Sequence, residues 1–201
     1  MIASPDDPTP TVLGLLMLSS FPHHFIPGAK IQFLRINGIE LHNNVIDNVV
    51  ISGNIVDQLI ILREKISKHN KVSSGTAYSL RHKINYDYPI IAIDQIICNA
   101  ILHRNYAETS DPIRVNWYNN HIEIISPGGP FGSVDCSNFG KPGITDYRNP
   151  NLASALKTLG FVQPFGRGIV IARKTMEQNG NPAPEFFPET HFVRCILRKN
   201  K

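Results

Sequence analysis

The hydrophobic positions of residues 93–103 repeat with the spacing of a helix that buries one face. They fall at i, i+3, i+4, i+7 and i+8: Ile93, Ile96, Ile97, Ala100 and Ile101. Beside them Gln95, Asn99 and His103 recur every four residues, although an amide gains nothing in propensity inside a helix, because its side chain competes with the backbone. An Asn oxygen suits magnesium, and a neighbouring His or Arg can meet phosphate. The pattern therefore indicates a ligand site; the alternative is an amphipathic helix with an ordinary polar flank.

Apolar residues instead fall at every second position on either side of Asn119-Asn120 within residues 113–125. An Asn-Asn pair tolerates the positive φ of a tight turn. This pattern predicts a β-hairpin. It runs into Ser126-Pro127-Gly128-Gly129-Pro130, where two glycines let the backbone approach a ligand closely and expose its N–H groups. A simple turn is the alternative for the glycine pair alone.

Two further helices are predicted from their termini. Asn149 is placed to cap the first, with Pro150 at its first position and Gly160 at its end. The segment Gly166-Arg167-Gly168-Ile169 opens the second, which ends at Gly180. Glycines at a helix N-terminus favour binding of an anion such as phosphate.

Two modules are predicted, residues 1–70 and 78–201, joined by a polar linker at 71–77. The first has strands, with Val12–Leu18 as a buried-strand candidate, followed by a helix that begins at Ser52. The inward residues of that helix are Ile55, Val56, Leu59, Leu62 and Ile66. The second module has helices on one face of a largely antiparallel sheet, so the expected class is α+β.

The motifs as a set resemble the RecG-related proteins, whose C-terminal domain is similar to GHKL-type ATPase domains. The segments that carry the resemblance are Gln95-x-x-x-Asn99-Ala100-x-x-His103-Arg104, Ser126-Pro127-Gly128-Gly129, Arg148-Asn149-Pro150, Gly166-x-Gly168-Ile169 and Pro184-Glu185-Phe186. Residues 1–70 look like the end of the AlbA-like (Schlafen-type) α/β domain that precedes this region in such proteins. Because the opening half of that domain has no counterpart, the chain is expected to be a fragment or a shortened version.

The resemblance implies ATP and magnesium as ligands, with Asn99 holding the metal. The nucleotide-binding residues that it implies are Asn99, His103, Arg104, Ser126, Gly128, Gly129, Gly166, Arg167 and Gly168. Gln95 stands where the family has a catalytic Glu, and an amide cannot act as a general base. Asp94 lies about 100° round the helix from it, so it is a poor substitute. Ser126 or Pro127 replaces the family's adenine-reading Asp. We therefore expect nucleotide binding and at most a weak ATPase.

The net charge of +4 and the pI near 9.0 permit contact with DNA. The candidate nucleic-acid-binding residues are Lys65, Lys68, Lys71, Arg81 and Lys83; the alternative is a solvated surface. A helicase motor needs a G-x-x-x-x-G-K-[ST] loop, and the chain lacks one, since Gly140-Lys141 is followed by Pro142.

Composition favours a compact protein of the cytoplasm. The 201 residues, 42% of them hydrophobic, can bury a core, and no apolar run is long enough to cross a bilayer. Cys98, Cys136 and Cys195 lie far apart, as expected of free thiols in a reducing compartment. We expect a regulator or accessory factor that binds ATP and magnesium and contacts DNA, with a homo-oligomer as a candidate assembly. The rival is a non-enzymatic DNA-binding or protein-interaction module with a degenerate nucleotide site.

Overall fold

The computed structural model describes residues 1–74, 84–141, 143–162 and 166–200. Over those ranges the elements follow in the order β1 (Ile2–Ser4), β2 (Asp7–Pro10), α1 (Val12–Leu18), the 3-10 helix η1 (Pro22–His24), β3 (Ile31–Asn37), β4 (Asn44–Ile51), α2 (Ile55–His69), β5 (Val72–Ser74), β6 (Ile84–Tyr86), α3 (Ile90–His103), β7 (Ile113–Trp117), β8 (His121–Pro127), α4 (Pro150–Thr158), α5 (Gly168–Asn179), β9 (Glu185–Pro188) and β10 (Phe192–Arg198). Arg81 and Lys83, two predicted DNA contacts, lie outside the described residues, as do residues 75–77 of the predicted linker.

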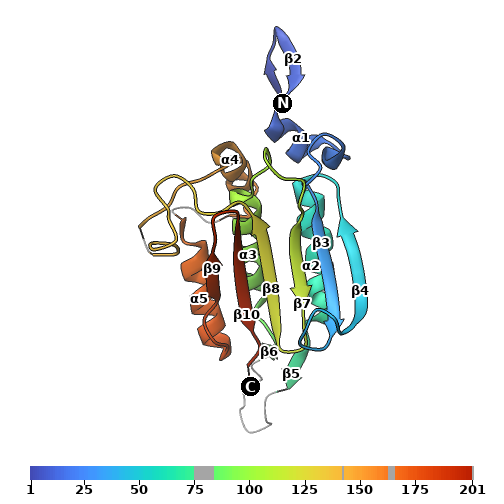
Figure 1. The fold of residues 1–201 in the computed structure, drawn as a ribbon, viewed down its shortest axis with the longest axis vertical. Coiled ribbons are helices and arrows are strands. Elements are labelled where there is room, and N and C mark those ends of the chain that lie inside the picture. Colours follow the sequence, from blue (N-terminus) through green and yellow to red (C-terminus); the bar gives the residue numbers. More distant parts are fainter. Residues whose placement is uncertain (75–83, 142, 163–165, 201) are drawn as a thin grey trace.

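Six strands form one sheet in the order β4-β3-β7-β8-β10-β9 (Figure 1). Neighbours are antiparallel except β3 and β7, which run parallel with Phe33 opposite Val115. The fold is therefore α+β, as predicted. The sheet also crosses the predicted module boundary, because β3 and β4 come from residues 1–70 and the other four strands from residues 78–201.

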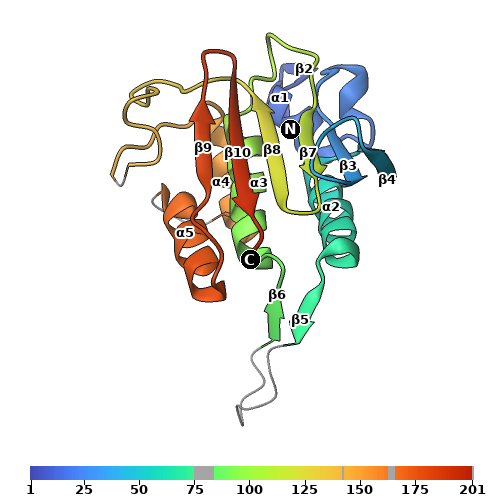
Figure 2. The same ribbon diagram turned by 60° about the horizontal axis from the view of Figure 1, so that its bottom comes forward.

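Helices α2, α3 and α5 lie on one face of this sheet, and α4 packs against α3 (Figures 1 and 2). Helix α3 lies at the centre of this layer, between α2 and α5. All five apolar residues of its predicted inward face are at most 7% exposed. Opposite them the sheet supplies Phe33, Val115, Ile122 and Ile124, also buried. The helical period of α3 therefore reflects burial against the sheet, and its polar flank points elsewhere.

The predicted hairpin is confirmed as β7 and β8. Trp117 pairs with Ile122, and the turn between the strands contains Asn119-Asn120, with the Tyr118 N–H donating to the His121 carbonyl at 2.9 Å. Strand β8 delivers Ser126 and the glycine pair to the end of α3. The hairpin therefore brings two distant motifs together.

The prediction of a buried strand at Val12–Leu18 is wrong, because these residues form α1. Thr11 caps the helix, its Oγ1 accepting from the Gly14 N–H at 3.0 Å, and Leu16 is buried while Leu18 is exposed. A short apolar run does not distinguish a strand from a helix by period alone. No helix in the described ranges is long and apolar enough to span a bilayer.

The start predicted for the following helix is also wrong. Helix α2 begins at Ile55, and its cap is Asn54, whose Oδ1 accepts from the Asp57 N–H at 3.0 Å. Ser52 and Gly53 precede the cap, with Gly53 at a φ of 111°. Four of the five predicted inward residues are buried and the fifth, Val56, is partly buried against the core.

Candidate functional site

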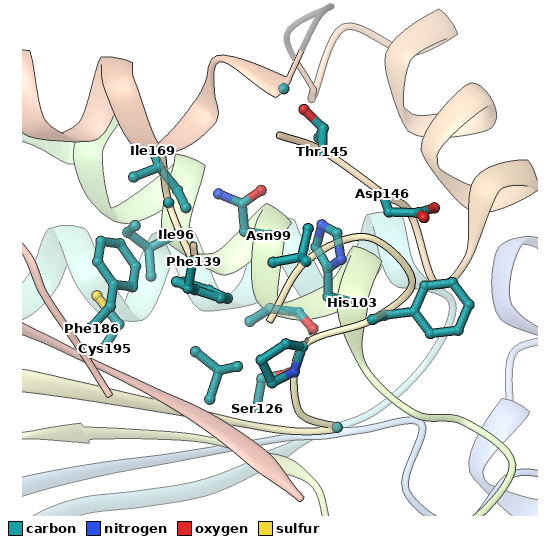
Figure 3. Close-up of a pocket in the computed structure, with 18 of the residues that line it drawn as sticks. Ile96, Asn99, His103, Ser126, Phe139, Thr145, Asp146, Ile169, Phe186 and Cys195 are labelled. Atoms are coloured by element: carbon teal, nitrogen blue, oxygen red, sulfur yellow. Dashed lines mark hydrogen bonds between the residues drawn. The ribbon is translucent and has the colours of Figure 1, made fainter. Parts of the chain in front are cut away.

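A pocket lies between α3, the end of β8, the start of α5 and the loop that runs from Gly128 to Tyr147 (Figure 3). Its floor is apolar and includes Ile96, Ala100, Ile124, Phe186 and Cys195. Polar side chains also line it: Asn99, His103, Ser126, Lys141, Thr145 and Asp146. An apolar cavity with a few convergent polar groups is typical of a small-molecule site.

Asn99 and Gln95 meet the first residue of α5. A Cβ at Gly168 would lie 3.1 Å from both Asn99 Nδ2 and Gln95 Oε1, so glycine lets the two helices approach at the amides. Asn99 lines the pocket, and its Nδ2 is buried with no hydrogen-bond partner among the described residues. Gln95 is 9% exposed and lies beneath Gly168, outside the pocket lining.

His103 stands one turn beyond Asn99 at the C-terminal end of α3. Its ring stacks on Tyr147, with centroids 5.6 Å apart and planes 19° apart. Burial, and secondarily the Arg148 charge, lowers the pKa of His103 to about 4, while Asp146 opposes this. The imidazole is therefore neutral at pH 7 and offers one N–H donor and one acceptor.

Ser126 is 5% exposed, and its hydroxyl donates to the Ala100 carbonyl at 2.8 Å. The oxygen therefore faces the pocket only as an acceptor. Gly128, at a φ of 106°, already donates its N–H to the His191 carbonyl at 2.7 Å, so the expected exposure of that group to a ligand is not found. A Cβ at Gly129 would lie 2.3 Å from the Thr190 carbonyl oxygen. The second glycine is therefore required because the two backbone segments pack closely there.

The second glycine segment places the N-terminus of α5 at the pocket. Gly166 lines the cavity with a φ of 62°, and a Cβ there would lie 2.5 Å from Thr145 Oγ1. Gly168 begins the helix, and Ile169 and Val170 face the cavity. Arg167, a predicted nucleotide contact, is exposed and is not among the lining residues.

Arg104, another predicted nucleotide contact, also lies away from the pocket. It is 1% exposed, and its guanidinium donates to the carbonyls of Asn105, Thr109 and Asp111. A Cβ at Gly28 would lie 1.5 Å from its Nη2, so the chain around residue 28 encloses the group. One step along a helix rotates a side chain by about 100°, which separates Arg104 from His103. Arg104 therefore stabilises the fold through these backbone contacts.

Replacing Arg104 with Met should lower the free energy of unfolding by several kcal/mol, since each buried unpaired carbonyl costs about 1–3 kcal/mol. Urea unfolding measures the change. Arg114→Met, at an arginine whose side chain is 43% exposed, is the matched control and should stay within about 0.5 kcal/mol of wild type. Equal stability of Arg104→Met and the control would show that these bonds contribute nothing to the fold.

Asn149 was predicted to cap α4 with its side chain, and this prediction is wrong. Asn149 does precede α4 but makes no capping bond to it. Its Nδ2 donates instead to the carbonyls of Leu102 and Arg104, at 2.8 and 2.9 Å. Carbonyls at a helix C-terminus lack intrahelical donors, so Asn149 caps the end of α3 from outside.

One of the lysines of the predicted DNA-binding surface is engaged in an ion pair. Lys65 Nζ lies 2.9 Å from the Asp47 carboxylate, and this lysine is the main cause of the lowered pKa of Asp47. Lys68 and Lys71 are exposed. The ion pair leaves Lys65 less available to a phosphate than the sequence suggested.

Several lining residues carried no sequence signal. Lys141, Thr145 and Asp146 come from a long connection without periodicity, as does Phe139, whose ring centroid lies 5.6 Å from that of Phe186, a residue of the Pro184-Glu185-Phe186 motif. For Thr145 and Asp146, the one available indication in the sequence is that they lie just before the Arg148-Asn149-Pro150 motif. Long loops of this kind often carry function.

The region from the hairpin through the glycine turn and α5 to β10 matches a family model. Residues 110–197 match a family model described as "Putative ATP-dependent DNA helicase recG C-terminal". This match supports a RecG-related, ATPase-like C-terminal domain. It begins after α3, so it does not include Gln95, Asn99 or His103.

A solved structure is similar over nearly the whole chain. The crystal structure of the DIP2311 protein from Corynebacterium diphtheriae superposes with a TM-score of 0.78 at 22% identity, covering 94% of this chain. That likeness shows a shared fold. The chain spans 37% of the length of the DIP2311 protein. A search of curated proteins finds no match.

Proposed function

We propose that the pocket binds ATP or a similar nucleotide with magnesium, in a RecG-related regulator or accessory factor that hydrolyses it weakly or not at all. The observation that carries the proposal is the carboxamide of Asn99, whose buried Nδ2 finds no hydrogen-bond partner within the described part of the chain and which lies in a pocket at the start of α5. Buried polar atoms are nearly always hydrogen-bonded, so this unpaired N–H donor calls for an acceptor, such as a phosphate oxygen or water.

The donor set fits such a ligand. The Asn99 oxygen is a hard ligand that would suit magnesium, which supplies charge to bind the phosphates. The first N–H groups of α5 have no intrahelical acceptors and lie at the positive end of the helix, where phosphate oxygens bind well. His103, neutral at pH 7, can donate to phosphate. The apolar floor at Ile96 and Ile124 suits the face of a base.

A thermal-shift screen of nucleotides with and without magnesium tests the proposal. Stabilisation by ATP that requires magnesium is expected. No shift with any nucleotide at millimolar concentration would favour the rival, an interaction module with a degenerate site.

Ser126 is expected to select adenine over hypoxanthine. Because its proton is given to Ala100, its oxygen can only accept, which suits the amino group of adenine and opposes the carbonyl of hypoxanthine. ATP should bind about tenfold or more tightly than ITP, as one unmade hydrogen bond of about 1.4 kcal/mol implies. Calorimetric titration of both nucleotides measures the ratio.

In the Ser126→Ala variant the two nucleotides should bind alike. Ser154→Ala, at an exposed serine of α4, is the control and should keep the preference. Wild-type protein that binds ITP as tightly as ATP would remove Ser126 from base selection.

Contact with DNA remains a proposal of the same kind. It is supported by the net charge of +4 and by the exposed Lys68 and Lys71, whereas Lys65 is engaged with Asp47. Such contact would be insensitive to sequence and steeply salt-dependent, because diffuse positive charge is its only source. A cytoplasmic location and self-association are likewise predictions.

A further inference from the structure

Arg148 connects three segments around the pocket. Its Nε donates to the His103 carbonyl and its Nη2 to the Gly129 carbonyl, both at 3.1 Å. The guanidinium also lies over the ring of Phe131, 4.7 Å from the centroid. One planar group therefore contacts the end of α3, the glycine turn and the loop over the pocket.

The neighbours of Arg148 extend this contact. Tyr147 stacks on the ring of His103, and Asn149 caps the end of α3 through the carbonyls of Leu102 and Arg104. Residues 147–149 thus contact α3 over its last turn. Because these contacts come from three successive residues, they fix the position of the segment as well as that of the helix.

We infer that Arg148 is a positioning residue, which holds the glycine turn and His103 in one fixed arrangement and thereby sets the affinity of the pocket. The rigid fork of a guanidinium can donate to two separate carbonyls at once, whereas an ammonium on a flexible stem does not fix their geometry in the same way. The positioning role of Arg148 rests on contacts within the chain. The effect on affinity rests on the proposed nucleotide function.

His103 provides a reporter of this arrangement. The charged groups that act on it are Arg148, which lowers its pKa together with burial, and Asp146, which raises it. Loss of the arginine charge should therefore raise the pKa of His103 from about 4 toward its ordinary value. A lysine at position 148 keeps the positive charge but loses the planar guanidinium, so the pKa of His103 should stay closer to its wild-type value.

The test compares Arg148→Gln and Arg148→Lys with wild type, and uses Arg114→Gln as the control at a half-exposed arginine that does not line the pocket. NMR titration gives the pKa of His103, and hydrogen exchange reports on residues 103–106 and 127–131. Exchange in both segments should rise at least tenfold in Arg148→Gln and Arg148→Lys, because both lack the fork, while the pKa should rise mainly in Arg148→Gln. The control should match wild type.

Nucleotide affinity is measured on the same proteins. ATP with magnesium should bind about tenfold more weakly to both Arg148 variants. Unchanged exchange and an unchanged His103 pKa in Arg148→Gln would overturn the inference; should that variant not fold, unchanged exchange in Arg148→Lys would overturn it equally. Changed exchange with no nucleotide binding in wild type would retain the positioning role and reject the nucleotide function. Normal affinity despite changed exchange would reject the link between the two.

Discussion

The Asn99→Ala variant is expected to lose all stabilisation by ATP and magnesium. A ligand at one hundred times its dissociation constant adds about 2.7 kcal/mol, which for a chain of this size is a rise in Tm of roughly 5–10 °C. The unliganded variant should melt close to wild type, because Asn99 Nδ2 has no hydrogen-bond partner to lose in the ranges that the structure describes. Differential scanning fluorimetry with and without nucleotide measures both quantities.

Asn151→Ala provides the matched control, since Asn151 is an exposed helical asparagine on α4 that is not among the lining residues. It should keep the full shift, and omission of magnesium should reduce the wild-type shift. A nucleotide-dependent shift that survives in Asn99→Ala would mean that the ligand binds elsewhere or without this amide.

The central elements could be predicted because their burial leaves a period in the sequence. The inward face of helix α3 packs on the sheet, so its apolar residues repeat at helical spacing, and the hairpin alternates because one face of β8 is buried. Helix α1 has only seven residues, too few to show a period. The pairing of β3 with β7 joins residues about eighty apart, and no local pattern encodes it.

The site could be predicted only where residues share an element. Asn99 and His103 lie four apart on α3 and do line one pocket, together with Ser126 and both glycines of the turn. Arg104 lies outside the pocket lining, and the motif could not indicate this, because it gives residue order but not which side of the helix end faces the cavity. Lys141, Thr145 and Asp146 come from a loop whose course depends on packing, including the contact of Arg173 with the Gly140 carbonyl. Sequence spacing holds no information on that course.

ATP hydrolysis by the wild-type chain should be barely measurable, and Gln95→Glu should raise it. A well-placed general base contributes on the order of 100- to 10,000-fold, and the Gln95 amide cannot accept a proton. The neighbouring carboxylate offers no substitute, since Asp94 is paired with Arg63 of α2, with the Arg63 Nη2 and Asp94 Oδ2 atoms 3.0 Å apart. A coupled assay of phosphate release, on protein purified identically for each variant, measures the rates.

The position of residue 95 decides how the new carboxylate would behave. Burial beneath Gly168 would raise its pKa, which brings a carboxylate closer to the range suited to a base at pH 7, while the nearby N-terminus of α5 opposes full neutralisation. The gain should therefore appear as a rate that rises with pH through an acidic to neutral transition.

Two further variants separate this role from a contaminating activity. The double change Gln95→Glu, Asn99→Ala should be inactive, because a base has nothing to act on when the nucleotide and its magnesium are not held. Gln178→Glu, which adds the same charge near the other end of α5, should leave the rate at the wild-type level. If wild type already turns over at a rate that Asn99→Ala leaves unchanged, then α3 is not the catalytic helix. If Gln95→Glu binds ATP normally and gains no activity, the amide is not what limits hydrolysis, and the terminal phosphate must lie beyond the reach of residue 95.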